Sequence, residues 1–519
     1  MKTYKFLSAF GAAAVLLGLA ACADTDAQYD VKPMDAPEYV GESPSAQAPI
    51  LLGERTIELK FNEKINFVTD NTSQITFDGK PVKKALVLGA SDVLTITVDA
   101  DFADTHTLHV PAGLVKTADN QSYDKDIDLT WNLPALPSNT ATQMTEQLGF
   151  GWNLGNHFDT SSMEWGYWDK ATPTQSLYTS LSSAGVKTVR MPVTWTSHMT
   201  DGVIDAAYLD EVAQNVDWAI SAGLNVIVNT HHDSFETTLG AAQKNAAVNE
   251  ENEKLITAVW SQVAQKLGNR SEKLIFETFN EVHDNDQWSA SKATDDQLDL
   301  LNEWNQVALN AIRANEGAVK HWVGVSTYAA SIDGIDALKL PEDEANKVMV
   351  GVHCYDPYNF CLSSDSIWGH TLTGNATSEQ ALIETMYKLR SKFIDNNIPV
   401  YIGEFGCSEH LKPWQNVVRK YYLEFYCRTA NKFGIPVMLW DNMNLVPSVD
   451  EKTGSSESHG YFDHNNGDFV RDGANLIPMM VNAATSNDAS YTYATVWNNA
   501  PKITFERDKK GNVINVIVE

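Results

Sequence analysis

Two glutamates stand at positions where a carboxylate is costly unless it does chemistry. Glu281 lies in the apolar run FETFNEV (276–282), and Glu404 lies in YIGEFG (401–406). Both runs have the near-continuous apolar character of strands that are buried in a parallel sheet. A carboxylate in such a place destabilises the fold unless it is paired or faces a polar cleft. The pair therefore predicts a proton donor and a second carboxylate that act on one bond.

Other polar and aromatic residues occur at the ends of similar apolar runs, and they are candidates for supporting or substrate-binding roles. They are Asn156, Arg190, His231, His232, Asn280, His353, Tyr355 and Trp440. An arginine inside an apolar strand needs an anionic partner, and Glu404 is the natural candidate for Arg190. His353 and Tyr355 are two residues apart, so both are expected to face the same side of a strand.

A metal site is a weaker interpretation of the histidines. His231, His232 and Asp233 are consecutive, but no H-E-x-x-H or comparable ligand spacing accompanies them. We expect neither a metal nor a cofactor.

The elements that must position these residues alternate between short apolar strands and amphipathic helices. The predicted strands are FGWNLGN, KTVRMPV, NVIVNTH, LIFETFNE, HWVGVST, VMVGVHCY, PVYIGEFG and PVMLWDN. Eight β/α units predict an α/β protein, with a (β/α)8 TIM barrel over residues 138–488. No G-x-G-x-x-G motif follows a strand, as a dinucleotide-binding doubly wound sheet would require. In a TIM barrel the carboxyl ends of the strands carry the active site, which is where the candidate residues fall.

The helices of this segment carry recognisable end signals. A helix predicted over 295–315 begins with a capping box at Thr294. Three other predicted helices end in glycine, at Gly185, Gly223 and Gly434, where a left-handed cap is expected.

The flanking segments predict smaller elements. Residues 49–134 show strand-like alternation in TIELKF, SQITFDG, VLTITVD and THTLHV, which predicts a small all-β sandwich. The closing pattern of this segment, over residues 105–132, resembles bacterial Ig-like domains. This sandwich could be a spacer or a carbohydrate binder, and its few aromatic residues favour a spacer. Residues 489–519 predict a C-terminal β-hairpin extension whose packing the sequence leaves open.

The N-terminus predicts export. Lys2 and Lys5 precede an uncharged run over residues 6–21, and Leu-Ala-Ala then precedes Cys22. This pattern resembles a lipoprotein signal peptide over residues 1–21, with lipid attached to Cys22, although a plain secretory signal is the alternative. Residues 22–48 would form a flexible tether. We expect a lipid-anchored protein of the bacterial cell envelope, exposed at the surface of the outer membrane.

The net charge limits the classes of ligand, and the cysteine content indicates whether disulfides hold the fold. The net charge of −29 argues against nucleic acid and polyanionic substrates and fits a neutral ligand. Beyond Cys22 only four cysteines remain, too few for a disulfide scaffold in a chain of this size. A Cys354–Cys361 bridge is possible, but free buried thiols are preferred. We expect a monomer.

The barrel segment resembles the endoglucanases of glycoside hydrolase family 5, subfamily 4. The resemblance is carried by GWNLGN (151–156), EWG (164–166), VRMPVTWTSHM (189–199), NTHHD (229–233), FETFNE (276–281), VHCYDPYNF (352–360), IGEFG (402–406) and MLWDN (438–442). Val282 replaces the proline that usually follows the acid, and Cys354 replaces a common aromatic residue. Neither departure touches the chemistry.

The resemblance implies retaining hydrolysis of a β-1,4-glucan, with Glu404 as nucleophile and Glu281 as acid and then base. Asn280 would bind the sugar 2-hydroxyl, His231 and His353 would orient substrate and acid, and Trp440 would form the floor of the subsite at which cleavage occurs. Aromatic residues such as Trp165 and Trp195, after the first two strands, suggest an open cleft for internal cuts in xyloglucan, mixed-linkage glucan or cellulose derivatives. An endo-β-1,4-mannanase and a non-catalytic surface glycan-binding lipoprotein are the alternatives.

Overall fold

The computed structural model describes residues 35–161, 167–363, 368–369, 377–411, 413–448, 456–488, 490–495, 503–510 and 513–518. The predicted signal peptide, Cys22, the first part of the tether and Trp165 lie outside these residues. Two compact units make up the chain, with most of residues 56–129 in the smaller and residue 130 onward in the larger. Among the described helices, none has the length and apolar character needed to span a bilayer.

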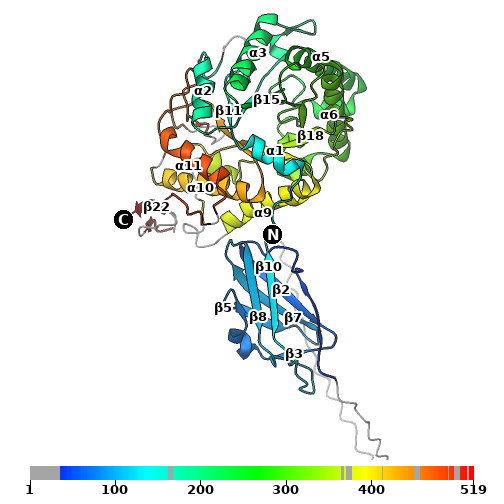
Figure 1. The fold of residues 1–519 in the computed structure, drawn as a ribbon, viewed down its shortest axis with the longest axis vertical. Helices are drawn as coiled ribbons and strands as arrows, with labels where there is room; N and C mark the ends of the chain where they lie inside the picture. Colours follow the sequence, from blue (N-terminus) through cyan, green and yellow to red (C-terminus); the bar gives the residue numbers. More distant parts are fainter. Residues whose placement is uncertain are drawn as a thin grey trace, which may run out of the picture. The chain divides into compact units, whose positions relative to one another are not determined.

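The smaller unit is built from short antiparallel strands (Figure 1). One four-stranded sheet has the order β1 (Tyr39–Ser43), β2 (Gly53–Phe61), β7 (Val93–Ala100) and β6 (Lys84–Val87). The other has the order β10 (Ile127–Asn132), β8 (Thr105–Val110), β4 (Thr76–Phe77) and β5 (Lys80–Pro81), and β3 (Asn66–Phe67) pairs with β9 (Val115–Lys116). Alternate residues of β2 and β7 are buried, which is the pattern of strands with one face on a core.

The segment SQITFDG differs from the prediction of a full strand. Only Thr76 and Phe77 pair as strand, because Thr69–Gln74 forms a 3-10 helix. The hydroxyl of Thr72 donates to the carbonyl of Thr69 at 2.6 Å, a local bond that competes with strand pairing.

The larger unit is a closed barrel of eight parallel strands, as the sequence predicted. In order around the barrel these are β11 (Phe150–Leu154), β12 (Thr188–Met191), β15 (Asn225–Asn229), β16 (Leu274–Glu277), β17 (Trp322–Ser326), β18 (Val348–His353), β19 (Val400–Phe405) and β20 (Val437–Asp441). The barrel closes because β11 pairs with β20.

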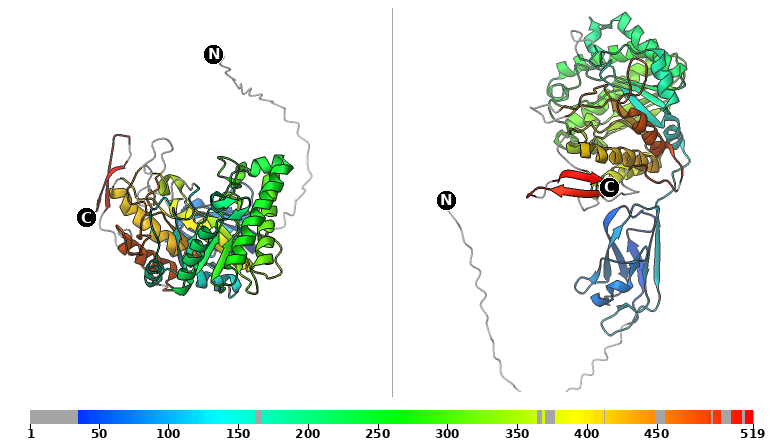
Figure 2. Two further views of the ribbon diagram at one scale, coloured as in Figure 1. Left: turned by 90° about the horizontal axis from the view of Figure 1, so that it is seen from above. Right: turned by 90° about the vertical axis from the view of Figure 1, so that its left-hand side faces the viewer.

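Helices surround these strands on the outside (Figures 1 and 2). They are α1 (Thr140–Leu148), α2 (Gln175–Ser183), α3 (Ala206–Ser221), α4 (Leu239–Lys244), α5 (Ala246–Leu267), α6 (Asp295–Asn315), α7 (Tyr358–Cys361), α9 (Thr377–Lys392), α10 (Pro413–Phe433) and α11 (Gly473–Thr485). A short pair, β13 (Met199–Thr200) and β14 (Val203–Ile204), lies between β12 and α3, and β21 (Ile503–Arg507) pairs with β22 (Val513–Val518) as the predicted C-terminal hairpin.

The interior of the barrel is layered along its axis. At the amino-terminal end, Met144 and Leu148 of α1 pack with inward-facing residues of five strands, among them Met349, Tyr401 and Met438. Above this apolar plug, Asn153, Arg190 and Glu277 form a buried polar layer. The apolar plug therefore closes one end of the barrel and leaves the other end for chemistry.

Local predictions on the helices hold in the structure. The helix α6 spans the predicted residues, and Thr294 and Gln297 form both bonds of the capping box. Gly185, Gly223 and Gly434 have φ of 94°, 90° and 73°, the left-handed conformation expected at these helix ends. The four described cysteines are free and buried, so no Cys354–Cys361 bridge is present in this part of the chain.

The fourth strand is shorter than predicted, and this is a correction to the position of Glu281. The strand β16 ends at Glu277, so Glu281 lies on the connection that follows it. Beyond Glu277 the backbone amide of Thr278 bonds to Gly324, after which Asn280 and Glu281 leave the sheet. This geometry allows both adjacent side chains to turn inward.

The capping box gives a test of the local energetics. Thr294→Ala removes the hydroxyl that accepts the amide of Gln297 at 3.3 Å, and we expect it to lower the free energy of unfolding by about 1 kcal/mol. Equilibrium urea unfolding followed by circular dichroism measures this change. Thr179→Ala, which removes an exposed hydroxyl within α2, is the control and should change the free energy by less than about 0.5 kcal/mol. Equal stability of the two variants would contradict the role of the cap.

Candidate active site

The centre of the barrel is organised around the buried guanidinium of Arg190. Its Nη1 donates to Oε1 of Glu404 at 2.7 Å and to Oδ1 of Asn153 at 3.0 Å. Its Nη2 donates to Oε1 of Glu277 at 2.7 Å and to Oδ1 of Asn280 at 2.8 Å. Burial lowers the pKa of Arg190, but the charges of Glu277 and Glu404 outweigh burial and raise it. Arg190 is therefore a permanent cation that joins four strands or their extensions.

Glu277 is the principal residue that the sequence analysis missed. It shares Arg190 with Glu404, and it also accepts hydrogen bonds from Asn229 Nδ2 at 2.9 Å and from the hydroxyl of Tyr401. Burial raises the pKa of Glu277, but the charge of Arg190 outweighs it and the net shift is downward. A charged residue inside the strand LIFE was the available signal, since a buried carboxylate requires a buried partner.

Glu404 is held from both sides. Arg190 contacts Oε1, and the hydroxyl of Tyr355 donates to Oε2 at 2.9 Å. Burial raises the pKa of Tyr355 well above its usual value, so the phenol keeps the proton that it donates. These two bonds fix the orientation of the carboxylate.

Glu281 faces Glu404 across His353. Nδ1 of His353 lies 2.6 Å from Oε1 of Glu281 and 3.8 Å from Oε2 of Glu404. One oxygen of each glutamate and one nitrogen of His353 all lie within 4.8 Å of one another. The side chain of Glu281 is 21% exposed and that of Glu404 is 8% exposed, so both reach the cleft.

The two glutamates differ in what surrounds them. Burial, followed by the negative charge of Glu236, raises the pKa of Glu281 to about 7. Burial also lowers the pKa of His353 to about 4, which leaves the imidazole neutral at neutral pH. Glu281 therefore tends to carry a proton, whereas Glu404 is paired with Arg190. This difference suits Glu281 to act as an acid and Glu404 to act as a nucleophile.

A cavity of about 1090 Å³ opens over this pair at the carboxyl ends of the strands. Eight of the predicted residues line it: Asn156, His231, His232, Glu281, His353, Tyr355, Glu404 and Trp440. The rings of His231 and Trp440 are nearly parallel, at 6° with centroids 6.1 Å apart. They present two flat surfaces beside the glutamates.

Four predicted residues have other positions. Arg190 and Asn280 are buried beneath the cavity, where Arg190 bonds to Glu404 and Glu277 and Asn280 accepts a hydrogen bond from Arg190. Trp195 is fully buried, and its indole nitrogen donates to the carbonyl of Asn229 at 2.8 Å, so it supports the third strand instead of lining the cleft. Trp165 lies outside the described residues.

Several cavity residues are absent from the predicted set. Trp168, Trp288 and Tyr358 are 42%, 56% and 53% exposed along the cavity wall, and Glu457 is a further carboxylate in the lining. They come from loops after β11, β16, β18 and β20. The sequence signal was an aromatic residue in each loop, but nothing in the sequence says which loop residues turn inward.

Asp159, His231 and His232 also form a cluster whose ligand atoms lie within 4.8 Å of one another. Burial lowers the pKa of His232, but the hydrogen bond from Nδ1 to Glu236 at 3.1 Å outweighs it and raises the pKa to about 9. A protonated imidazole has no lone pair for a metal. The cluster is thus better suited to sugar hydroxyls than to a cation at neutral pH.

Comparison with known proteins agrees with this geometry. Residues 149–445 match the model of the cellulase family, glycosyl hydrolase family 5. The chain is 33% identical over 329 residues to endoglucanase B of Neocallimastix patriciarum, covering 59% of this chain and 66% of that protein. It is 28% identical over 396 residues to the xyloglucan-specific endo-β-1,4-glucanase BoGH5A of Bacteroides ovatus, covering 69% of this chain and 75% of that one.

A solved structure gives the same answer for the fold. The GH5-4 broad specificity endoglucanase from Bacteroides salanitronis superposes with a TM-score of 0.59 at 33% identity, covering 67% of this chain and 96% of that one. Together with the barrel and the paired glutamates, these matches confirm the predicted fold class and the predicted activity of an endo-β-1,4-glucanase. The chain belongs to the cellulase family of glycoside hydrolases, family 5.

Proposed function

We propose that this enzyme cleaves β-1,4-glucan chains by double displacement, with Glu404 as nucleophile and Glu281 as acid and base. The observation that carries the proposal is the spacing of the two carboxyl groups, whose nearest ligand atoms lie within 4.8 Å. Retaining enzymes hold the two groups about 5–5.5 Å apart, whereas inverting enzymes need about 6.5–9.5 Å to admit a water. The short spacing supports attack by Glu404 itself.

The supporting residues have separable roles in this scheme. Arg190 and Tyr355 hold the carboxylate of Glu404 in place, aimed at the anomeric carbon. His353 hydrogen-bonds Glu281 and keeps it beside the leaving oxygen. Asn280 is held by Arg190 and Glu236, and its amide is the group that would meet the sugar 2-hydroxyl. His231 and Trp440 provide the flat walls of the subsite.

We propose xyloglucan and mixed-linkage glucan as preferred substrates, followed by cellulose derivatives. The exposed aromatic residues Trp168, Trp288 and Tyr358 spread along the cavity, which suits a polymer that passes through an open cleft. The name of the Bacteroides ovatus relative supports xyloglucan as the first polymer to test.

The location of the enzyme is a further part of the proposal. The lipobox-like sequence before Cys22 supports lipid attachment, and we propose a monomer anchored in the bacterial outer membrane and exposed at the surface. An enzyme at this place would cut polymers that are too large to enter the cell.

Variants of the two glutamates test their roles. We expect Glu404→Ala to lower kcat on xyloglucan by about 10⁴-fold or more, and added azide to restore turnover with inverted product. We expect Glu281→Ala to lower kcat by about 10²–10⁴-fold on the polymer and far less on an aryl cellobioside with an activated leaving group. Reducing-end release and product stereochemistry by NMR measure these effects.

The control for charge removal is Glu250→Gln, since Glu250 is exposed on α5 and pairs only with Lys254 in the described residues. It should cleave at the rate of the unmodified enzyme. If azide instead restored turnover of Glu281→Ala with inverted product, and did not restore Glu404→Ala, the roles of nucleophile and acid would be exchanged between the two glutamates.

The pH profile tests the protonation of Glu281. Its pKa is raised to about 7, so the acid form is present below this pH and is lost as the pH rises through it. We expect kcat/KM on xyloglucan to fall about tenfold per pH unit above pH 7. Glu281→Gln, assayed on the activated aryl cellobioside, should lack this alkaline limb. An alkaline limb that persists in Glu281→Gln would assign it to another group.

Substrate choice is tested by comparing three polymers. We expect kcat/KM to be higher by about tenfold or more for xyloglucan and mixed-linkage glucan than for mannan, because the axial 2-hydroxyl of mannose misses the contacts built for glucose. A rapid fall in viscosity with few reducing ends would demonstrate internal cuts. Preference for mannan would favour the mannanase alternative, and binding without cleavage would favour the glycan receptor.

A further inference from the structure

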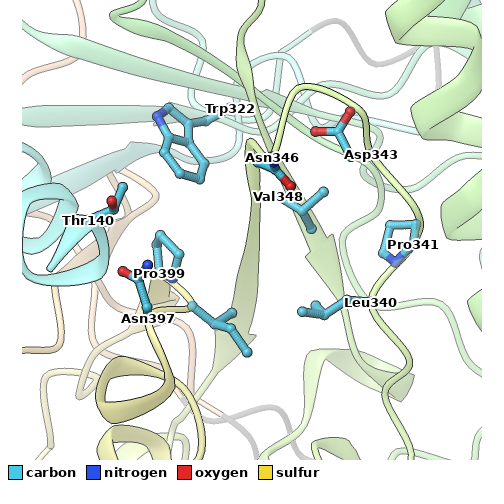
Figure 3. Close-up of a pocket in the computed structure, with 10 residues that line it drawn as sticks. Thr140, Trp322, Leu340, Pro341, Asp343, Asn346, Val348, Asn397 and Pro399 are labelled. Carbon is cyan, nitrogen blue, oxygen red and sulfur yellow. The ribbon is translucent and has the colours of Figure 1, made fainter.

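A second pocket lies at the end of the barrel that faces away from the catalytic cleft (Figure 3). Its lining includes Trp322 at the start of β17, Val348 at the start of β18, residues 397–399 before β19 and Thr140 at the start of α1. The starts of parallel strands share one face of a barrel, while Glu281 and Glu404 lie at the opposite face. The pocket is therefore separate from the active site.

The pocket has the size of a small-molecule site. Its volume is about 480 Å³, within the range of about 300–1,000 Å³ for ligand pockets. Figure 3 shows the indole of Trp322 projecting into the space, with Pro399 and Leu340 on the surrounding walls. Leu340 is 39% exposed, so the pocket is open to solvent. These side chains give it a flat apolar wall.

Polar groups without protein partners stand beside this apolar wall. Among the described residues, no hydrogen bond is recorded for the hydroxyl of Thr140, the side-chain amide of Asn346 or the indole N–H of Trp322. The Oδ1 of Asn397 accepts from the amide of Ala141 at 3.2 Å, which leaves its Nδ2 as a donor. Donors and acceptors around an aromatic ring match a ligand that has an apolar face and a rim of hydroxyls.

The charge of the pocket selects a neutral ligand. Asp343 is the one charged residue among the ten lining residues, and the guanidinium of Arg313 occupies both of its oxygens at 2.8 and 2.9 Å. A phosphate, sulfate or uronic acid would find no free cation in this lining, and an amine would find no free carboxylate. An uncharged polyhydroxylated molecule satisfies all the groups that remain.

We propose that this pocket is a second, non-catalytic binding site for a neutral β-1,4-glucan. One glucosyl unit packs on Trp322, and its hydroxyls bond to Asn346 and Thr140. The choice of glucan over other neutral sugars rests on the proposed substrate of the cleft. A polymer held at both faces of one barrel dissociates more slowly than one held at a single face, because each site raises the local concentration for the other.

Affinity electrophoresis of the mature chain in native gels that contain xyloglucan tests the proposal. All variants carry Glu404→Ala, so that the polymer in the gel is not hydrolysed. The dissociation constant is obtained from the dependence of electrophoretic mobility on polymer concentration. In this background we compare Trp322→Ala with Asn346→Gly, which deletes one amide yet allows the left-handed φ of 51°. Trp288→Ala weakens the cleft instead, and Trp218→Ala, a half-buried tryptophan of α3 that lines neither pocket, is the matched control.

We expect Trp322→Ala to raise the dissociation constant about fivefold, the loss of one stacked ring, and Asn346→Gly to raise it by a smaller factor. The double variant Trp322→Ala/Trp288→Ala should lose more binding than either single variant, whereas Trp218→Ala should migrate as the parent does. In the active background, Trp322→Ala should hydrolyse a small chromogenic cello-oligosaccharide at the parent rate, which shows that the barrel is folded.

Unchanged mobility of both Trp322→Ala and Asn346→Gly would overturn the second site. If the Glu404→Ala variant hydrolysed the polymer in the gel, the assignment of Glu404 as nucleophile would be wrong. The second site would then be tested with the same variants in gels that contain methylcellulose that the enzyme does not hydrolyse.

Discussion

A buried guanidinium between two carboxylates is the constraint on which the site depends. Arg190 has no exposure to solvent, and every one of its donors that the structure records is used by Glu277, Glu404, Asn153 or Asn280. Removing one partner from such a group leaves an unpaired buried charge, which costs about 3–5 kcal/mol. The strands β11, β12, β16 and β19 are thus held in mutual register by the same atoms that orient Glu404.

The glycines and the tyrosine beneath this network show how the barrel makes room for it. The hydroxyl of Tyr401 donates to Glu277 from below, and it occupies the space where a Cβ on Gly324 or Gly351 would lie. Small residues on β17 and β18 therefore allow a large one on β19 to reach across the axis. The polar layer rests on an apolar plug in which α1 takes part, and this plug separates the charges from the closed end of the barrel.

Much of the architecture could be predicted from the sequence because its signals are local. The eight apolar runs, the capping box of α6 and the glycines at helix ends depend on a few adjacent residues, and the structure has all of them. The position of Glu281 was harder, since the apolar run FETFNEV continues past the point at which β16 ends. Its side chain reaches the cleft because the backbone has left the sheet.

Residues whose role depends on distant partners were beyond the reach of the sequence. Glu277 and Glu281 are alike in sequence, as two glutamates of one apolar run, and the partners that keep Glu277 buried come from β12, β15 and β19. Trp195 is of the residue type that often stacks on a sugar, yet its indole nitrogen donates a hydrogen bond to the carbonyl of Asn229 in the core. The walls formed by Trp168, Trp288 and Tyr358 depend on how long loops fold back, and loop residues carry no periodic pattern.

The network around Arg190 also contributes a net charge to the site that a bound sugar meets. With Glu281 protonated and His353 neutral, this network holds one cation, Arg190, and two anions, Glu277 and Glu404, while the protonated His232 of the same cavity is paired with Glu236. Their sum is one negative charge, which nothing in a neutral glucan balances. As the glycosidic bond breaks, the sugar gains positive charge, and the enclosed sum approaches zero only at that moment. The network is thus electrostatically complementary to the oxocarbenium ion and less so to the uncharged polymer. Burying an excess carboxylate destabilises the free enzyme, but the same charge lowers the activation barrier.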